Sequence, residues 1–263
     1  MTDRDPTESL PIVASFCQVY EEKVSPSRSK KASQKSSCGG TGLMSMRVVS
    51  VNCGLPQEVQ WHGRTVTTGI YKQPVEGRVG LRQLNLEGDR QADLSVHGGK
   101  EKAVYCYPLD HYDYWRAELP GRQLPIGMFG ENFTTDGLSE NTVFIGDKFS
   151  IGSAEVVVTQ PRLPCYKLGI RFESDEMVKR FLISARTGFY LAVTREGAVT
   201  ANDEIVFIDR EPNSVPVSEI TRLYVAKKYS AGDLALAART LSIAALPEGW
   251  KDYFREQLQR FKA

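Results

Sequence analysis

The chain has 263 residues, of which 41% are hydrophobic and 25% are charged, as in an ordinary globular protein that buries a core. Its net charge of +1 gives no electrostatic indication of a nucleic-acid or membrane-surface partner. No apolar run has the length of a transmembrane helix, and the first residues have no signal-peptide pattern. We therefore expect a cytoplasmic protein that binds neither nucleic acid nor membrane.

The five cysteines are odd in number, widely spaced and without a C-x-x-C pair. This pattern argues against a disulfide framework and against a zinc ribbon, and it favours a reducing compartment. They are Cys17, Cys38, Cys53, Cys106 and Cys165.

Residues 1–46 differ in composition from the rest of the chain. The stretch 23–43 has no acidic residue and is rich in Ser, Lys and Gly, with no recurring apolar period. Such a segment cannot bury enough apolar surface to offset its chain entropy, so we predict a disordered N-terminal extension.

Residues 47–211 carry the patterns of many short strands and few helices. The predicted strands are 46–52, 79–86, 102–107, 142–149, 151–159, 189–193 and 204–208. The predicted helices in this region are 108–119 and 174–182. Many strands at irregular spacing favour a mainly β domain with some α structure, built as a closed or nearly closed barrel.

Residues 212–263 have a different, helical periodicity. Three short amphipathic patterns follow Pro216, and the second begins at Ser230 with Asp233 in the position of a capping box. We predict a small C-terminal three-helix domain whose apolar faces pack against each other or against the barrel.

The segment 160–168 (QPRLPCYKL) is the most informative for chemistry, because it places Cys165 on the loop that leaves a predicted strand. Its two prolines stiffen the loop, and Arg162 and Lys167 flank the thiol. Nearby positive charge favours a thiolate, the form that attacks electrophiles or binds soft metals. The alternative is that Cys165 is a small buried apolar residue.

Paired glycines, Gly98 and Gly99, form a second candidate site. Their backbone amides can converge on an anion, with Arg90 and Lys100 as countercharges, although such pairs are also common in plain turns. His97 is a candidate proton donor or ligand, or else a structural histidine. The other two histidines lack metal-ligand spacing to it.

Two further polar residues are candidates for ligand binding. Asn132, in FGENFTTDGL, carries donors and acceptors that suit a heterocycle, although a turn between extended segments explains the pattern equally well. Lys72, before a Gln-Pro pair, is a candidate phosphate ligand or a solvated lysine.

Together these segments resemble the YiiM-like branch of the MOSC family, named after the C-terminal domain of molybdenum cofactor sulfurases. The resemblance covers about residues 47–211, and the helical region resembles the three-helix domain that follows in this branch. The motifs, in chain order, are TGIYKQPV, NLEGDRQAD, VHGGKEKAVYCYP, HYDYW, FGENFTTDGL, GDKF and QPRLPCYKL.

The resemblance implies a β-barrel that binds a molybdenum cofactor, a molybdenum ion held by the dithiolene of a phosphorylated pterin. The family's metal-ligating or sulfur-carrying cysteine corresponds to Cys165, and His97 is a candidate proton donor. The cofactor-binding positions correspond to Lys72, Arg90, His97, Gly98, Gly99, Asn132, Arg162 and Cys165.

The implied reaction is the reduction of N-hydroxylated compounds such as 6-hydroxylaminopurine, which detoxifies them. No flavin or haem motif is present, so we expect a separate reductase protein as electron donor. A homodimer is a compatible assembly. Two alternatives remain: a sulfur carrier with a persulfide on Cys165, and a non-catalytic carrier of the molybdenum cofactor.

Overall fold

The computed structural model describes residues 46–92 and 98–262. The predicted disordered extension and His97 therefore lie, apart from residue 46, outside the described residues.

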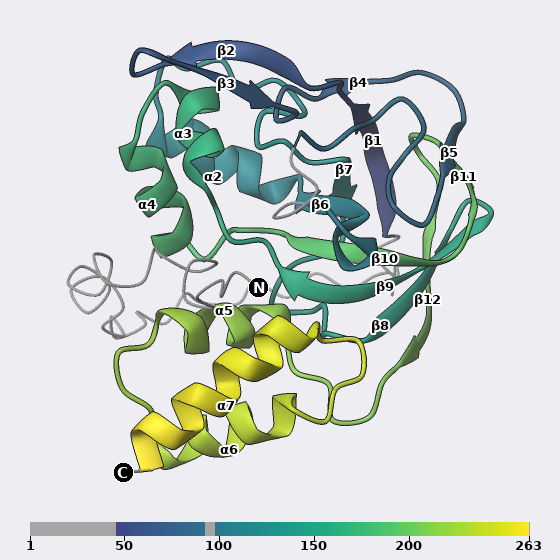
Figure 1. The fold of residues 1–263 in the computed structure, drawn as a ribbon. Coiled ribbons are helices and arrows are strands. Elements are labelled where there is room, and N and C mark those ends of the chain that lie inside the picture. The colour runs from purple at the N-terminus through teal and green to yellow at the C-terminus, as the bar shows by residue number, and fades with distance from the viewer. Residues whose placement is uncertain (1–45, 93–97, 263) are drawn as a thin grey trace, which may run out of the picture.

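The centre of the fold is a curled, mixed sheet of eight strands in the order β12-β8-β9-β10-β6-β7-β1-β4 (Figure 1). Only β6 and β7 pair in parallel, and the other neighbours are antiparallel. The strands are β1 (Arg47–Cys53), β4 (Gln73–Pro74), β6 (Val104–Pro108), β7 (Phe133–Asp136), β8 (Asp147–Ile151), β9 (Ala154–Pro161), β10 (Phe189–Arg195) and β12 (Ile205–Arg210). The sheet curls so far that the start of β12 meets β1, where Arg47 and Glu204 form a bridge and the N–H of Ile205 donates to the carbonyl oxygen of Met46 at 2.8 Å. The fold is therefore a partial barrel, in agreement with the closed or nearly closed barrel that the sequence predicted.

Two small antiparallel sheets complete the β structure. One pairs β5 (Val79–Leu81) with β11 (Gly197–Val199). The other is the hairpin of β2 (Gln57–Trp61) and β3 (Arg64–Thr68), which turns at His62 and Gly63 with positive φ angles of 47° and 74°. Two positive φ angles fit a two-residue hairpin turn, whose twist matches that of the strands. The sequence analysis missed this hairpin because its side chains are mostly exposed.

Among the described residues, three α-helices lie together on one side of the sheet (Figure 1), and a short 3₁₀ helix precedes β6. They are η2 (Lys100–Lys102), α2 (Asp110–Glu118), α3 (Tyr166–Phe172) and α4 (Glu176–Ile183). An aromatic cluster joins these helices to the sheet. Its fully buried members are Tyr107, Tyr112, Trp115, Phe129, Phe172 and Phe181.

The C-terminal region consists of α5 (Val217–Val225), α6 (Ala231–Thr240) and α7 (Glu248–Lys262), which lie together beside β8 and β9 (Figure 1). The predicted capping box is present, because Ser230 and Asp233 exchange side-chain and backbone hydrogen bonds. The helices share one hydrophobic core with the sheet. These observations confirm a mainly β fold with α structure and three C-terminal helices. None of the described helices is long and apolar enough to span a membrane.

Two predicted strands are longer than the observed ones, and one helix was missed. The strand predicted at 79–86 ends at Leu81. The strand predicted at 142–149 begins only at Asp147, because Gly146 has a φ of 92° and a turn occupies the preceding residues. The helix α3 was not predicted at all. It contains Gly169, and glycine has a low helix propensity. Cys165 therefore lies at a junction between a strand and a helix.

Candidate functional site

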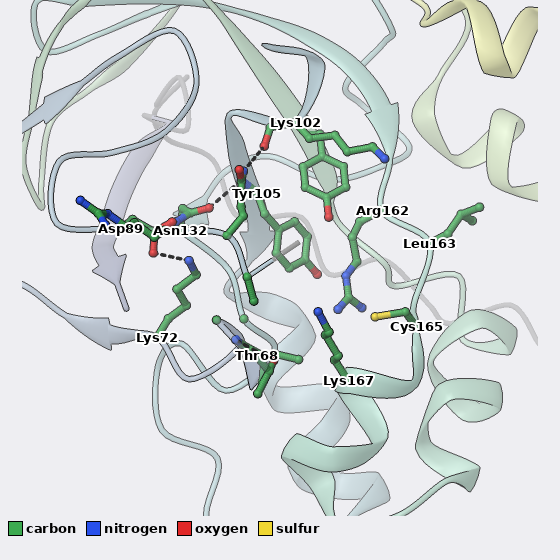
Figure 2. A pocket seen from close by; sticks show the side chains of 17 residues that line it. Thr68, Lys72, Asp89, Lys102, Tyr105, Asn132, Arg162, Leu163, Cys165 and Lys167 are labelled. Atoms are coloured by element: carbon green, nitrogen blue, oxygen red, sulfur yellow. Dashed lines mark hydrogen bonds and ion pairs between the residues drawn. The ribbon is translucent and has the colours of Figure 1, made fainter. Parts of the chain in front are cut away.

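A pocket opens where the end of β9, the start of α3 and the segments after β3 and β5 meet (Figure 2). Its empty volume, counted together with the open solvent at its mouth, is about 660 Å³. Its lining includes the polar side chains of Lys72, Asp89, Lys102, Asn132, Arg162, Cys165 and Lys167.

Cys165 is the residue immediately before α3, and its partly exposed thiol lines the pocket. The other two cysteines of the described chain, Cys53 and Cys106, are buried. Burial raises the pKa of both of these thiols, which keeps them protonated and unreactive. Among the described cysteines, the thiol that a ligand in the pocket can reach is therefore that of Cys165.

Arg162 lies on the strand exit three residues before Cys165, and Figure 2 shows its guanidinium close to the sulfur. The side chain is only 6% exposed, and its Nη1 has no hydrogen-bond partner. The guanidinium carbon lies 5.1 Å from the centre of the Tyr105 ring and 5.2 Å from that of Phe181. A buried, stacked cation with an unused donor is suited to an anionic or strongly accepting ligand.

The charge of Arg162 is secure despite its burial. Burial lowers the pKa of an arginine, but the neighbouring Tyr105, Tyr190 and Cys165 outweigh this effect and the pKa of Arg162 is raised. The guanidinium is therefore a fixed positive charge in the pocket wall.

The opposite end of the pocket is built around Asp89, which is 3% exposed. One carboxylate oxygen, Oδ1, accepts from Lys72 Nζ and from the backbone N–H of Gly54 at 2.9 Å. The other, Oδ2, accepts from Asn132 Nδ2 at 2.9 Å. Lys72 is buried as well, so the solvated lysine that we considered is wrong and its charge is compensated by Asp89.

Asn132 uses its amide for the fold. Its Nδ2 donates to Asp89 and to the carbonyl oxygen of Asn52 at 3.3 Å, while its Oδ1 accepts from the N–H of Tyr105 at 3.1 Å. Both amide hydrogens are engaged, so the side chain keeps only one free acceptor position on its oxygen. Asn132 thus links three neighbouring segments at the pocket wall.

The buried Glu131 fixes the turn that leads to Asn132. Its carboxylate accepts from the N–H groups of Gly127 at 3.0 Å and Phe129 at 3.1 Å, and also from the hydroxyl of Tyr112. Burial raises the pKa of Glu131, and these hydrogen bonds oppose that effect. The backbone at this side of the pocket is therefore rigidly held.

The pocket has a strong excess of positive charge. Its described lining contains five basic side chains, Lys72, Arg90, Lys102, Arg162 and Lys167, and one acidic side chain, Asp89. Burial lowers the pKa of Lys102, and Glu101 partly offsets this effect. Positive charge therefore predominates in the described lining, which favours a ligand with negative charge.

The structure brings together Lys72, Arg90, Asn132, Arg162 and Cys165 of the predicted residues. Arg90 is exposed at the pocket, while Gly98 and Gly99 precede η2 and are not among its described lining. The pocket also contains four residues that the sequence did not predict for it, namely Asp89, Lys102, Tyr105 and Tyr190. Asp89 lies in the motif NLEGDRQAD and Lys102 in the motif VHGGKEKAVYCYP. Their charge within these motifs was the sequence feature that could have identified them as pocket residues.

The site is thus a cationic pocket with a partly exposed cysteine at the rim of a curled β-sheet, a setting suited to an anionic ligand. The model of the MOSC domain matches residues 93–206. The chain is 40% identical to the uncharacterized protein YflK of Bacillus subtilis over 213 residues, which are 81% of this chain and 95% of YflK.

Two further relatives refine the comparison. The crystal structure of YiiM from Geobacillus stearothermophilus is 30% identical, has a TM-score of 0.67, and matches over 81% of this chain and 99% of that one. A protein of Gibberella moniliformis named "Reductase" is 35% identical over 176 residues, which are 66% of this chain but only 31% of that protein. The chain belongs to the MOSC family, in its YiiM-like branch.

Proposed function

We propose that this protein binds a molybdenum cofactor and reduces N-hydroxylated compounds, with 6-hydroxylaminopurine as a representative substrate. The observation that carries the proposal is the pairing of the partly exposed Cys165 with the buried guanidinium of Arg162, whose Nη1 has no hydrogen-bond partner, in one cationic pocket. Membership of the MOSC family supports the choice of cofactor.

The residues present fit this cofactor. The part of the chain that the structure describes has no group of three His, Cys, Asp or Glu side chains able to hold a metal ion. A metal in the pocket therefore needs most of its ligands from elsewhere, and a dithiolene provides them. Cys165 supplies one soft thiolate, and Arg162 supplies a donor for negatively charged groups.

Each side of the pocket has its own role in this proposal. Cys165 holds the metal, and Arg162 and Lys167 bind anionic groups next to it. The Asp89–Lys72–Asn132 cluster keeps the opposite wall in shape. When bound, the cofactor supplies the two electrons of the reduction.

The overall reaction balances as R–NH–OH + 2 e⁻ + 2 H⁺ → R–NH₂ + H₂O. The N–O bond breaks, the nitrogen is reduced, and its oxygen leaves as water. The electrons come from a separate reductase protein, as the sequence analysis expected. The name "Reductase" of the Gibberella moniliformis relative supports a reductive reaction. His97 remains the candidate proton donor.

The test is turnover of 6-hydroxylaminopurine by the holoprotein with a chemically reduced dye as electron donor. We expect the wild type to produce the amine and Cys165→Ser to produce none. Tyr166→Ala is the matched control, because Tyr166 is the neighbouring residue and is 52% exposed. A wild type that carries molybdenum cofactor but reduces no N-hydroxylated base contradicts the proposal.

A sulfur carrier is the second candidate, favoured by the same exposure of the Cys165 thiol beside positive charge. It requires a persulfide on Cys165, visible after treatment with a sulfur donor as a reductant-sensitive mass increase of one sulfur atom. A binding protein that hands the cofactor to other enzymes is the third, and it requires transfer without turnover.

A further inference from the structure

A buried hydrogen bond connects the C-terminal helices to the strand that leads into the pocket. Trp250 on α7 donates its indole N–H to Oε1 of Gln160 on β9, at 3.0 Å. Both side chains are buried, with 8% of Trp250 and 6% of Gln160 exposed. Gln160 is two residues before Arg162, so the contact lies at the base of the strand exit that carries the candidate site.

The same glutamine contacts the segment that forms another wall of the pocket. Its Nε2 donates to the carbonyl oxygen of Glu101 at 3.4 Å, and the hydroxyl of Thr159 donates to that oxygen at 2.6 Å. Glu101 lies in η2, and the next residue, Lys102, lines the pocket. A second bond, from Gln91 Nε2 to the carbonyl oxygen of Lys102 at 3.1 Å, holds η2 from its other side.

We infer that the C-terminal helices position the η2 wall of the pocket through Trp250 and Gln160. In this arrangement the indole N–H fixes the orientation of the Gln160 amide, and the amide helps to fix Glu101 and therefore Lys102. Trp250 and Gln160 are positioning residues, because each acts through η2. The inference rests on the proposed function for the identity of the ligand, whereas the relay itself depends on the contacts of this chain.

The physical reason is the burial of the amide. A buried glutamine oxygen that loses its donor is left unsatisfied, so the side chain turns to find another partner and its Nε2 leaves Glu101. The position of Lys102 then becomes less defined, and the positive potential around Cys165 falls. Packing of the indole against Phe254 and Tyr224 is a separate contribution that a phenylalanine at position 250 largely retains.

The test measures the potential at Cys165 without any cofactor. The full chain is isolated from a host that lacks molybdenum cofactor, and the Cys165 peptide is followed by mass spectrometry during alkylation. Iodoacetate carries a negative charge and iodoacetamide is neutral, so the ratio of their rates reports the local charge. The variants are Trp250→Phe, Gln160→Leu and the double variant.

Tyr253→Phe is the matched control. Tyr253 is also on α7, but its hydroxyl donates to the carbonyl oxygen of Tyr224 at 3.1 Å, which keeps this bond within the C-terminal helices. We expect the iodoacetate-to-iodoacetamide ratio to fall about two- to threefold in Trp250→Phe and Gln160→Leu, as for displacement of one charge by a few ångströms. In the double variant the ratio falls no further than in Gln160→Leu, because both changes interrupt the same relay, and Tyr253→Phe keeps the wild-type ratio.

An unchanged ratio in Trp250→Phe and Gln160→Leu overturns the inference. An equal fall in the Tyr253→Phe control also overturns it, because that result indicates general loosening of the helices. The two proposals fail separately. A wild type that binds no molybdenum contradicts the proposed function and leaves the alkylation ratios interpretable.

Discussion

Each end of the pocket contains a buried cation, but the hydrogen-bonding groups of the two cations are satisfied differently. At one end, Lys72, Asp89 and Asn132 form a closed set of ion-pair and hydrogen-bond contacts. At the other end, Arg162 has an unused donor beside the accessible thiol of Cys165. The comparison teaches that buried charge alone does not identify a binding group. The compensated end is a structural wall, and the uncompensated end offers a ligand the more favourable binding free energy.

The largest effect is expected from Asp89→Asn, which breaks the compensated end. Lys72 would remain as a buried cation without its counterion, at an expected cost of about 3 kcal/mol in the free energy of unfolding. Urea denaturation measures it. The double variant Lys72→Met, Asp89→Asn is the control, because it removes both charges of the buried pair and should recover much of the lost stability. Equal stability of Asp89→Asn and wild type would show that the wall does not depend on this pair.

Arg162→Met tests the uncompensated end. We expect the affinity for inorganic phosphate to fall about tenfold, while the free energy of unfolding falls much less than in Asp89→Asn, because removal of Arg162 leaves no buried charge without its counterion. Calorimetric titration with phosphate and urea denaturation measure the two quantities. A loss of stability like that of Asp89→Asn, with phosphate binding intact, would reverse the roles that we assign to the two ends.

The pH dependence of the free energy of unfolding tests the surroundings of Cys53, a buried thiol whose pKa is affected by Asp89 at the compensated end. Burial, assisted by the Asp89 carboxylate, raises the pKa of Cys53 from 9.0 to about 11. The unfolded thiol ionises first, so this contribution to stability is complete below pH 9.0 and is lost as the pH rises towards 11. We expect a loss of about 1–2 kcal/mol in this window, and a shallower slope in Cys53→Ala. Identical slopes would remove Cys53 as the cause.

The smallest effect is expected for Lys167→Ala, at the rim of the uncompensated end. Lys167 is only partly buried, so its electrostatic contribution is screened by solvent. The affinity for phosphate should fall about threefold at low salt, and this difference from wild type should shrink at high salt. The free energy of unfolding should stay within about 0.5 kcal/mol of wild type. Titration at two ionic strengths checks it, and a salt-independent loss would point to a steric cause instead.

The sequence predicted the uncompensated end better than the compensated one. Arg162 and Cys165 lie within four residues on one strand exit, so local reasoning could place them together. Lys72 and Asp89 are 17 residues apart, and their pairing depends on how the loops after β3 and β5 pack. Local sequence cannot indicate which of several lysines meets a buried carboxylate.

The fold shows the same distinction between local and long-range information. The amphipathic pattern predicted α4 and the capping box of α6, because both depend on neighbouring residues. The helix α3 was missed because Gly169 lowers its propensity. A Cβ at Gly169 would lie 3.1 Å from the carbonyl oxygen of Ser174, so close packing explains this glycine.

The most direct test of the central claim is the molybdenum content of purified protein from a host that makes the cofactor. Elemental mass spectrometry compares the wild type with Cys165→Ser, and Tyr166→Ala serves as the control. We predict about one molybdenum per chain in the wild type and the control, because one pocket binds one cofactor, and little molybdenum in Cys165→Ser. Equal molybdenum in the wild type and Cys165→Ser, or none in the wild type when cofactor supply is verified, would contradict the account.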